Sequence, residues 1–187
     1  MGMRLVGKHS LLVLTLTLAI TTCLSRQAYA QAVATAMASG VSLQAGGGYT
    51  NYQADYGKRK LGGYFIFADY NRTPHWGLEF EARMLRFNQE FNSHETTFLI
   101  GPRYTYRKPH FTAYGKFLVG NGRFHFPYDY ADGSYFVLAP GVGVDVPLGS
   151  SRFTIRAADV EYQSWPNFTY GGLHPWGYSG GISARIF

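Results

Sequence analysis

The sequence has little charge, almost no cysteine and only one long apolar run, which lies at its N-terminus. Only 15% of the 187 residues are Asp, Glu, Lys or Arg, whereas soluble domains usually carry about a quarter. After residue 30, no apolar run approaches the roughly 20 residues that a membrane-spanning helix needs. Aromatic residues, by contrast, make up 17%, and there are 23 glycines. This composition fits either a compact all-β domain or a membrane barrel with dispersed apolar residues.

The first 30 residues have the order of a secretory signal peptide: a basic start, an apolar core over Leu11–Ile20 and a polar stretch ending at Ala30. The apolar core is too short to serve as a membrane anchor. We expect cleavage after Ala30, with sites as late as Ala38 as alternatives, then a short lead (31–40) and one domain (41–187). Cleavage would remove Cys23, which excludes disulfides, thiol catalysis and thiolate metal sites from the mature chain.

From Val41 onward, apolar and polar residues alternate in eight segments, as in β-strands. Three connections are tight turns and the four between them are longer, polar and aromatic. An even number of strands with this alternation of turns and loops is typical of a bacterial outer-membrane barrel. We therefore predict an all-β fold: an eight-stranded antiparallel up-and-down transmembrane β-barrel with short periplasmic turns and longer extracellular loops. The predicted strands are Val41–Tyr52, Leu61–Asn71, Trp76–Phe87, Thr96–Arg107, His110–Gly120, Tyr135–Pro147, Phe153–Ser164 and Trp176–Phe187.

The two faces of these strands differ in polarity. In the third strand, Trp76, Phe80 and Met84 share one face, while Glu79 and Arg83 share the other. A soluble barrel directs its apolar face inward, whereas a membrane barrel directs it toward lipid. The polar face mixes small residues with isolated charges, which favours a narrow polar interior. We predict an interior salt-bridged network made of Asp69, Glu79, Glu81, Arg83, Arg103, Lys116, Asp145, Asp159, Glu161 and Arg185.

Two strands depart from simple alternation. The seventh changes parity, and a bulge near Ala157–Ala158 would bring Arg156, Asp159 and Glu161 to the interior. The second has aromatic residues on both faces, so its register depends on an inward Asp69.

Aromatic residues gather near the strand ends, where the interfacial girdles of a membrane barrel are expected. The outer girdle would comprise Tyr52, Phe87, Tyr135, Trp165 and Trp176. The aromatic segment Asn121–Ser134 is the best candidate for a ligand-contacting outer loop.

Several motifs together resemble the small eight-stranded outer-membrane barrels of the OmpA/OmpX-like class, over nearly all of 40–187. They include His75–Glu81, Gly101–Tyr106, Gly141–Asp145 and Gly181–Phe187. The resemblance implies export to the cell outer membrane of a Gram-negative-type bacterium. It also implies a terminal aromatic residue that the barrel assembly machinery reads. Phe187 is out of phase with the apolar positions that include Ile186, so either residue could be the lipid-facing end.

Eight strands leave an interior that side chains can just fill. We therefore predict a structural or surface-interaction protein that displays its loops, with no cofactor or metal and no enzymatic activity. A narrow channel for small or apolar solutes is the alternative. A lipid-modifying enzyme is a weaker one, because adjacent residues such as Ser93, His94 and Glu95 point to opposite faces of a strand.

The first outer loop ends in a cationic run, Lys58, Arg59 and Lys60. Cations at that height would meet lipopolysaccharide phosphates, and a solvated loop tip is the alternative. Outer-membrane lipid and lipopolysaccharide are thus the expected partners of a monomer, and nucleic acid is not.

Overall fold

The structure is a computed structural model that describes residues 41–55, 60–88, 93–126, 132–149, 152–169 and 171–187. The predicted signal peptide and the lead that follows it lie outside these residues. The described residues fold into β-strands and turns without a helix. None of them, accordingly, belongs to a helix that is long and apolar enough to span a membrane.

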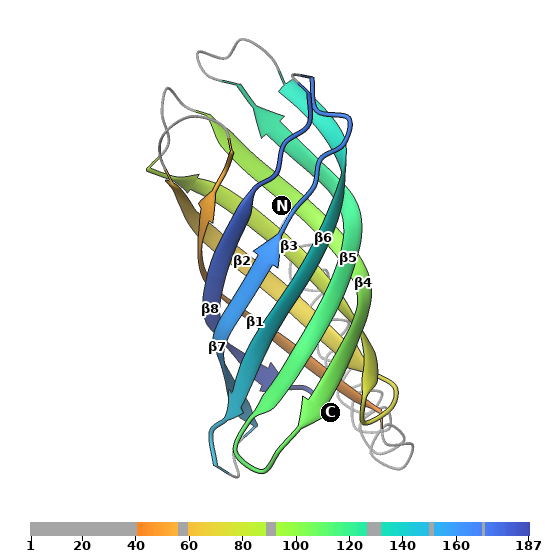
Figure 1. Cartoon of the computed structure of the whole chain (residues 1–187). Helices are drawn as coiled ribbons and strands as arrows, with labels where there is room; N and C mark the ends of the chain where they lie inside the picture. Colours follow the sequence, from red (N-terminus) through yellow and green to blue (C-terminus); the bar gives the residue numbers. More distant parts are fainter. Residues whose placement is uncertain (1–40, 56–59, 89–92, 127–131, 150–151, 170) are drawn as a thin grey trace, which may run out of the picture. The chain divides into compact units, whose positions relative to one another are not determined.

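Eight antiparallel strands form a closed barrel in which each strand pairs with its neighbours in the chain, and the last pairs with the first (Figure 1). The predicted eight-stranded antiparallel barrel is confirmed. The strands are β1 (Ser42–Gln53), β2 (Lys60–Asn71), β3 (Trp76–Phe87), β4 (His94–Arg107), β5 (Thr112–His125), β6 (Asp132–Pro147), β7 (Phe153–Tyr162) and β8 (Trp176–Arg185).

The connections divide between the two ends of the barrel. The strand ends joined by the β2–β3, β4–β5 and β6–β7 connections lie at one end of the barrel, here called the turn end. The strand ends joined by the other four connections lie at the opposite end, here called the loop end (Figure 1). At the loop end β5 continues to His125 and β6 begins at Asp132, so most of the predicted loop 121–134 is strand. Gly122 and Phe124 keep the inward parity of β5, and residues through His125 pair with both neighbouring strands.

The outer surface of the barrel is apolar and its interior is charged. On β3, Phe80 is 58% exposed, whereas Glu79 and Arg83 are at most 1% exposed. On β2, Ile66 is 63% exposed while the neighbouring inward residue Phe67 is 4% exposed. This distribution is opposite to that of a soluble barrel and is the one that a lipid-facing barrel requires.

The predicted bulge in β7 is confirmed. Pairing with β8 shifts between Arg156 and Asp159, and Ala157 and Ala158 are both exposed. The extra residue restores parity, so Arg156, Asp159 and Glu161 are all buried in the interior. Asp69 also points inward from β2, with no exposed surface, as the predicted register of that strand requires.

Candidate functional site

Buried charges from six strands meet inside the barrel. The four cations are Arg83, Arg103, Lys116 and Arg156, and the six carboxylates of this group are Asp69, Glu79, Glu81, Asp145, Asp159 and Glu161. Every one of these residues is at most 5% exposed. Because strand alternation directs them all to one face, closing the sheet forces them together.

Lys116 lies at the centre of this ion-pair network. Its Nζ is 3.1 Å from Glu79, 2.8 Å from Glu81, 2.9 Å from Asp159 and 3.1 Å from Glu161. One ammonium from β5 therefore joins carboxylates on β3 to carboxylates on β7, across the interior.

Two arginines organise the part of the network nearer the turn end. Arg103 pairs with Asp69 and Asp145, both at 2.5 Å, and Arg156 lies 3.1 Å from both Asp69 and Glu79. The two guanidinium groups thus share their carboxylates. A polar cavity of about 150 Å³ opens at the turn end and is lined by Arg103 and Asp145, so the network forms its inner boundary.

Inward aromatic rings support the guanidinium groups. The Cζ atom of Arg156 lies 3.5 Å from the ring centre of Phe67, and that of Arg103 lies 3.9 Å from the ring centre of Tyr114. Arg83 lies over the ring of Tyr52 at 4.2 Å. Each contact is a cation–π interaction that fixes a planar cation in one orientation.

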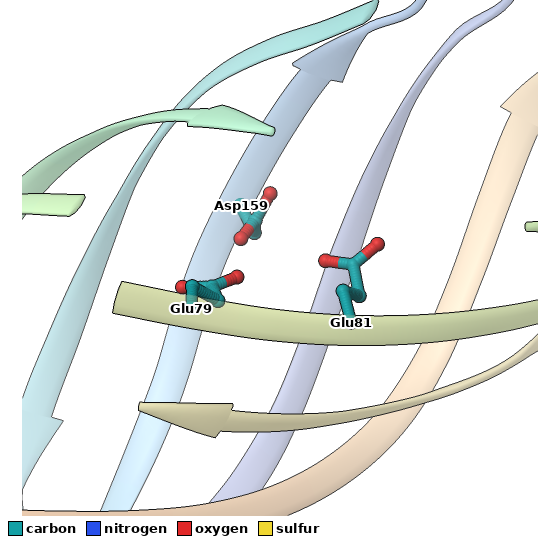
Figure 2. Close-up of side chains that lie close together, drawn as sticks. All are labelled: Glu79, Glu81 and Asp159. Carbon is teal, nitrogen blue, oxygen red and sulfur yellow. The ribbon is translucent and has the colours of Figure 1, made fainter. Parts of the chain in front are cut away.

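Three of the carboxylates, Glu79, Glu81 and Asp159, lie close enough together to suggest a metal site (Figure 2). Lys116 Nζ, however, is within 3.1 Å of an oxygen of each. The lysine ammonium therefore occupies the position that a cation would take, and the cluster is part of the ion-pair network.

A chain of hydrogen bonds leads from the network toward the loop end. Arg83 and Tyr52 both donate to Glu161 Oε1, at 2.6 and 2.9 Å. Gln163 Nε2 donates to the same oxygen at 2.9 Å, and Trp165 Nε1 donates to Gln163 Oε1 at 2.9 Å. The charged interior is thereby linked to the segment that follows β7.

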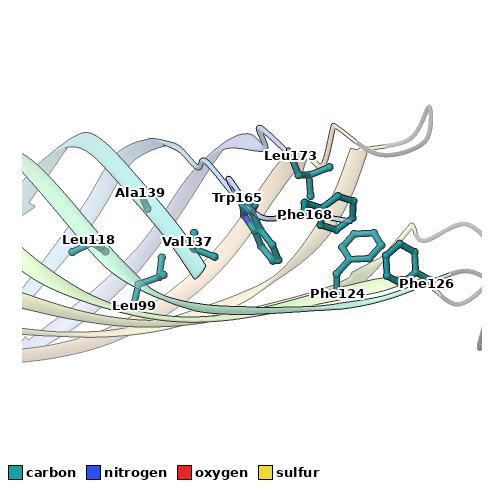
Figure 3. Packing of buried hydrophobic residues seen from close by; sticks show 9 residues of the cluster. All are labelled: Leu99, Leu118, Phe124, Phe126, Val137, Ala139, Trp165, Phe168 and Leu173. Atoms are coloured by element: carbon teal, nitrogen blue, oxygen red, sulfur yellow. The ribbon is translucent and has the colours of Figure 1, made fainter. Parts of the chain in front are cut away.

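Trp165 belongs to a cluster of nine buried apolar residues at the loop end, here called the apolar plug (Figure 3). The β7–β8 connection carries it inward: Ser164 exchanges backbone hydrogen bonds with Leu138 of β6, and Trp165 with Leu173. The members are Leu99, Leu118, Phe124, Phe126, Val137, Ala139, Trp165, Phe168 and Leu173.

The burial of several aromatic rings corrects two aromatic predictions. Tyr52 and Trp165 are fully buried, so they belong to the interior and not to the outer girdle. Phe124 and Phe126 face inward against Phe168, with ring centres 5.5 and 5.7 Å apart from it. They are therefore packing residues instead of displayed ligand contacts. Phe124 lies on the extended β5, and Phe126 follows the end of that strand with the same inward parity, which is the signal that the sequence offered.

The list of predicted network members lacked two buried charged residues, Arg156 and Glu95, although the predicted β7 bulge had placed Arg156 in the interior. Arg156 contacts four of the network's carboxylates, and the β7 bulge is the sequence signal for its inward position. Glu95 is fully buried on β4, and neither of its carboxylate oxygens has a hydrogen-bond partner among the described residues. It lies two residues before the inward Thr97, so extending β4 by parity would have found it.

The structure leaves one predicted network member apart. Arg185 is exposed at the turn-end cavity and, in the described part of the chain, makes no ion pair with the network. It is the last residue of β8, where the interior opens to solvent. Lys60 is exposed at the start of β2, while Lys58 and Arg59 lie outside the described residues.

The remaining predicted residues can also be placed. Glu95 points into the barrel, whereas His94 lies on the outer face with its ring 4.5 Å from that of His125, so Ser93, His94 and Glu95 do not converge as a catalytic triad. At the other end of the chain, Ile186 and Phe187 continue the backbone pairing with Leu43. Ile186 has the parity of the exposed residues of β8.

An apolar exterior around a closed eight-stranded antiparallel barrel defines a membrane barrel. A family model described as "Outer membrane protein beta-barrel domain" matches residues 16–179, and the chain belongs to this family. The resemblance to small eight-stranded outer-membrane barrels is confirmed. No curated protein sequence matches the chain closely enough to count as a relative.

Solved structures share this fold at low sequence identity. Neisserial surface protein A superposes with a TM-score of 0.63 and 14% identity, over 78% of this chain and 97% of that one. OprG from Pseudomonas aeruginosa gives a TM-score of 0.55 and 13% identity, over 77% and 95%. The N-terminal barrel domain of OprF from the same organism gives 0.51 and 14%, over 78% and 96%.

Proposed function

We propose that this protein is a closed outer-membrane scaffold with a structural or surface-interaction role, which presents its loop end at the cell surface. The single observation that carries this proposal is the double obstruction of the interior. The ion-pair network fills the middle of the barrel, and the apolar plug fills its loop end. A solute would have to displace both, and breaking buried ion pairs is costly.

This arrangement argues against the alternative of a narrow channel. A hydrophilic solute would meet the apolar plug, and an apolar solute would meet ten buried charges. The separation of His94 from Glu95 likewise argues against a lipid-modifying enzyme.

The expected surroundings follow from the same proposal. The exported chain would be a monomer that the barrel assembly machinery inserts, with Ile186 or Phe187 as its terminal signal. Its exposed apolar belt would contact outer-membrane lipid, and Lys60, with its neighbours Lys58 and Arg59, would reach lipopolysaccharide phosphates.

Planar-bilayer recording of the refolded mature chain tests the closed interior. We expect no steady conductance steps, because the ion-pair network and the apolar plug, both built from described residues, obstruct the interior between the two ends. A general porin recorded in the same bilayers would show that channels can be detected. Heat-modifiable gel mobility of the same preparation would show that the barrel is folded. Steady ohmic steps from the folded protein would overturn the proposal.

A further inference from the structure

We propose that the outer wall of β3–β6 near the loop end is a binding site for a phosphorylated lipid of the outer leaflet. Its phosphate would bind Arg86 and Arg123, and one of its acyl chains would lie in an adjacent apolar groove. The proposal concerns the outside of the barrel, so it is independent of whether the interior is closed.

The polar part of this site is a cavity of about 560 Å³ on the outer wall. Arg86 and Arg123 line it and are both exposed. The pairing of Thr96 with Arg123, and of Leu85 with Glu95, brings β3, β4 and β5 together here. Among the described residues, neither arginine forms an ion pair with a carboxylate.

Among the described residues, one carboxylate lines the cavity, and it has a partner of its own. Asp132 lies 2.6 Å from His125 Nδ1, and its side chain is 82% exposed. The stacked rings of His94 and His125 form part of the wall. The guanidinium groups thus give the cavity its positive character, and guanidinium groups bind phosphate in a bidentate manner.

The apolar part is a second groove, of about 550 Å³, which shares Phe98 with the polar cavity. Small residues form its floor: Ala82 pairs with Phe98 and with Ile66, and Ala45 pairs with Ala68. The large exposed side chains of Ile66, Phe80 and Phe98 flank this floor, so the groove offers an apolar surface on which an acyl chain can lie. When the headgroup of a lipid binds Arg123, its acyl chain can enter this groove beside Phe98.

Arg86 lies at the depth in the membrane at which a lipid headgroup is expected. Arg86 lies ten positions after Trp76, the first residue of β3 at the turn end. This separation matches the roughly 9–11 residues that a tilted strand needs to cross the bilayer. Arg86 therefore stands at the outer interface, where phosphate groups of an outer-leaflet lipid lie. Charge and apolar shape together select an anionic lipid over a protein partner.

Native mass spectrometry of the detergent-purified mature protein, titrated with diphosphorylated lipid A, tests the site. Each cation near an anionic lipid surface contributes about a factor of five in affinity. The double variant R86A/R123A should therefore bind lipid A about 30-fold more weakly. The matched control R72A/K108A removes two exposed cations from turns at the opposite end and should bind as the unaltered protein does.

Two further measurements distinguish a bound lipid from a bound free anion. The variant A82F, which fills the groove from the lipid-facing side, should weaken lipid A binding while the barrel keeps its heat-modifiable mobility. Inorganic phosphate should not displace the lipid at equal concentration. Equal binding by R86A/R123A and the unaltered protein, equal losses in R72A/K108A, unchanged binding by A82F, or displacement by inorganic phosphate would each overturn the proposed lipid site.

Discussion

The ammonium group of Lys116 holds four carboxylates together in the middle of the barrel, within 3.1 Å of each. Removing one partner of a buried ion pair leaves uncompensated charge and costs about 3–5 kcal/mol. The substitution Lys116→Met should therefore lower the free energy of unfolding by about that amount. Urea unfolding of the barrel refolded in detergent would measure it.

The control for this substitution is Lys108→Met in the exposed turn between β4 and β5. Its Nζ lies 5.0 Å from the ring centre of Tyr106 and forms no salt bridge with a described residue. This substitution should change the free energy of unfolding by no more than about 1 kcal/mol, the usual contribution of a charged interaction at the protein surface. A comparable small loss in Lys116→Met would show that the carboxylates do not depend on the lysine.

Replacing Glu95 should have the opposite effect on the free energy of unfolding from replacing Lys116. Glu95 is fully buried, and both its oxygens lack hydrogen-bond partners among the described residues, so the folded state bears a desolvation cost of about 1–3 kcal/mol. Replacing Glu95 with Leu should therefore leave stability unchanged or raise it in the same urea assay. Glu161→Leu, which removes the acceptor of Arg83, Tyr52 and Gln163, should lower it by about 3–5 kcal/mol. A large loss in Glu95→Leu would contradict this assignment.

At the scale of single elements, β5 provides a matched pair of glycines. A Cβ on Gly122 would lie 2.3 Å from the Trp165 ring, whereas a Cβ on Gly115 would meet no atom within 4 Å. Overpacking a filled interior costs about 1–3 kcal/mol, so Gly122→Ala should be destabilised by that amount and shift the tryptophan fluorescence. Gly115→Ala should be neutral or slightly stabilising. Equal effects would mean that Trp165 does not pack against β5.

The sequence predicts the elements well where a local pattern decides their orientation. Period-two alternation determines which face of β3 is charged, and the parity change at Ala157–Ala158 reveals the bulge in β7. The inward position of Trp165 is different. It requires the β7–β8 connection to fold back over β6 and a glycine at position 122 to make room. Both conditions join residues far apart in the chain, so no local pattern reports them.

For the whole molecule, the closed barrel and its apolar exterior are predictable because low charge and alternation together leave few other folds. The ion-pair partners within the interior cannot be predicted from the sequence in this way. Lys116 on β5 meets Glu161 on β7 and Glu79 on β3, and none of these strands is a neighbour of another. Such contacts depend on the stagger of all eight strands, which sequence alternation does not specify.

The seam between β1 and β8 also has a consequence for the order of assembly. Glycines line it, and a Cβ on Gly48 would lie 2.0 Å from the carbonyl oxygen of Gly180, so the two backbones approach closely with little side-chain packing. Thr50 and Ser179 meet across it although 129 positions separate them. Until Trp176–Arg185 arrives, the sheet has two unpaired edges, which are costly in lipid. Pairing of β8 with β1 removes both edges at once, so we expect the barrel to become stable in lipid only when this seam has closed.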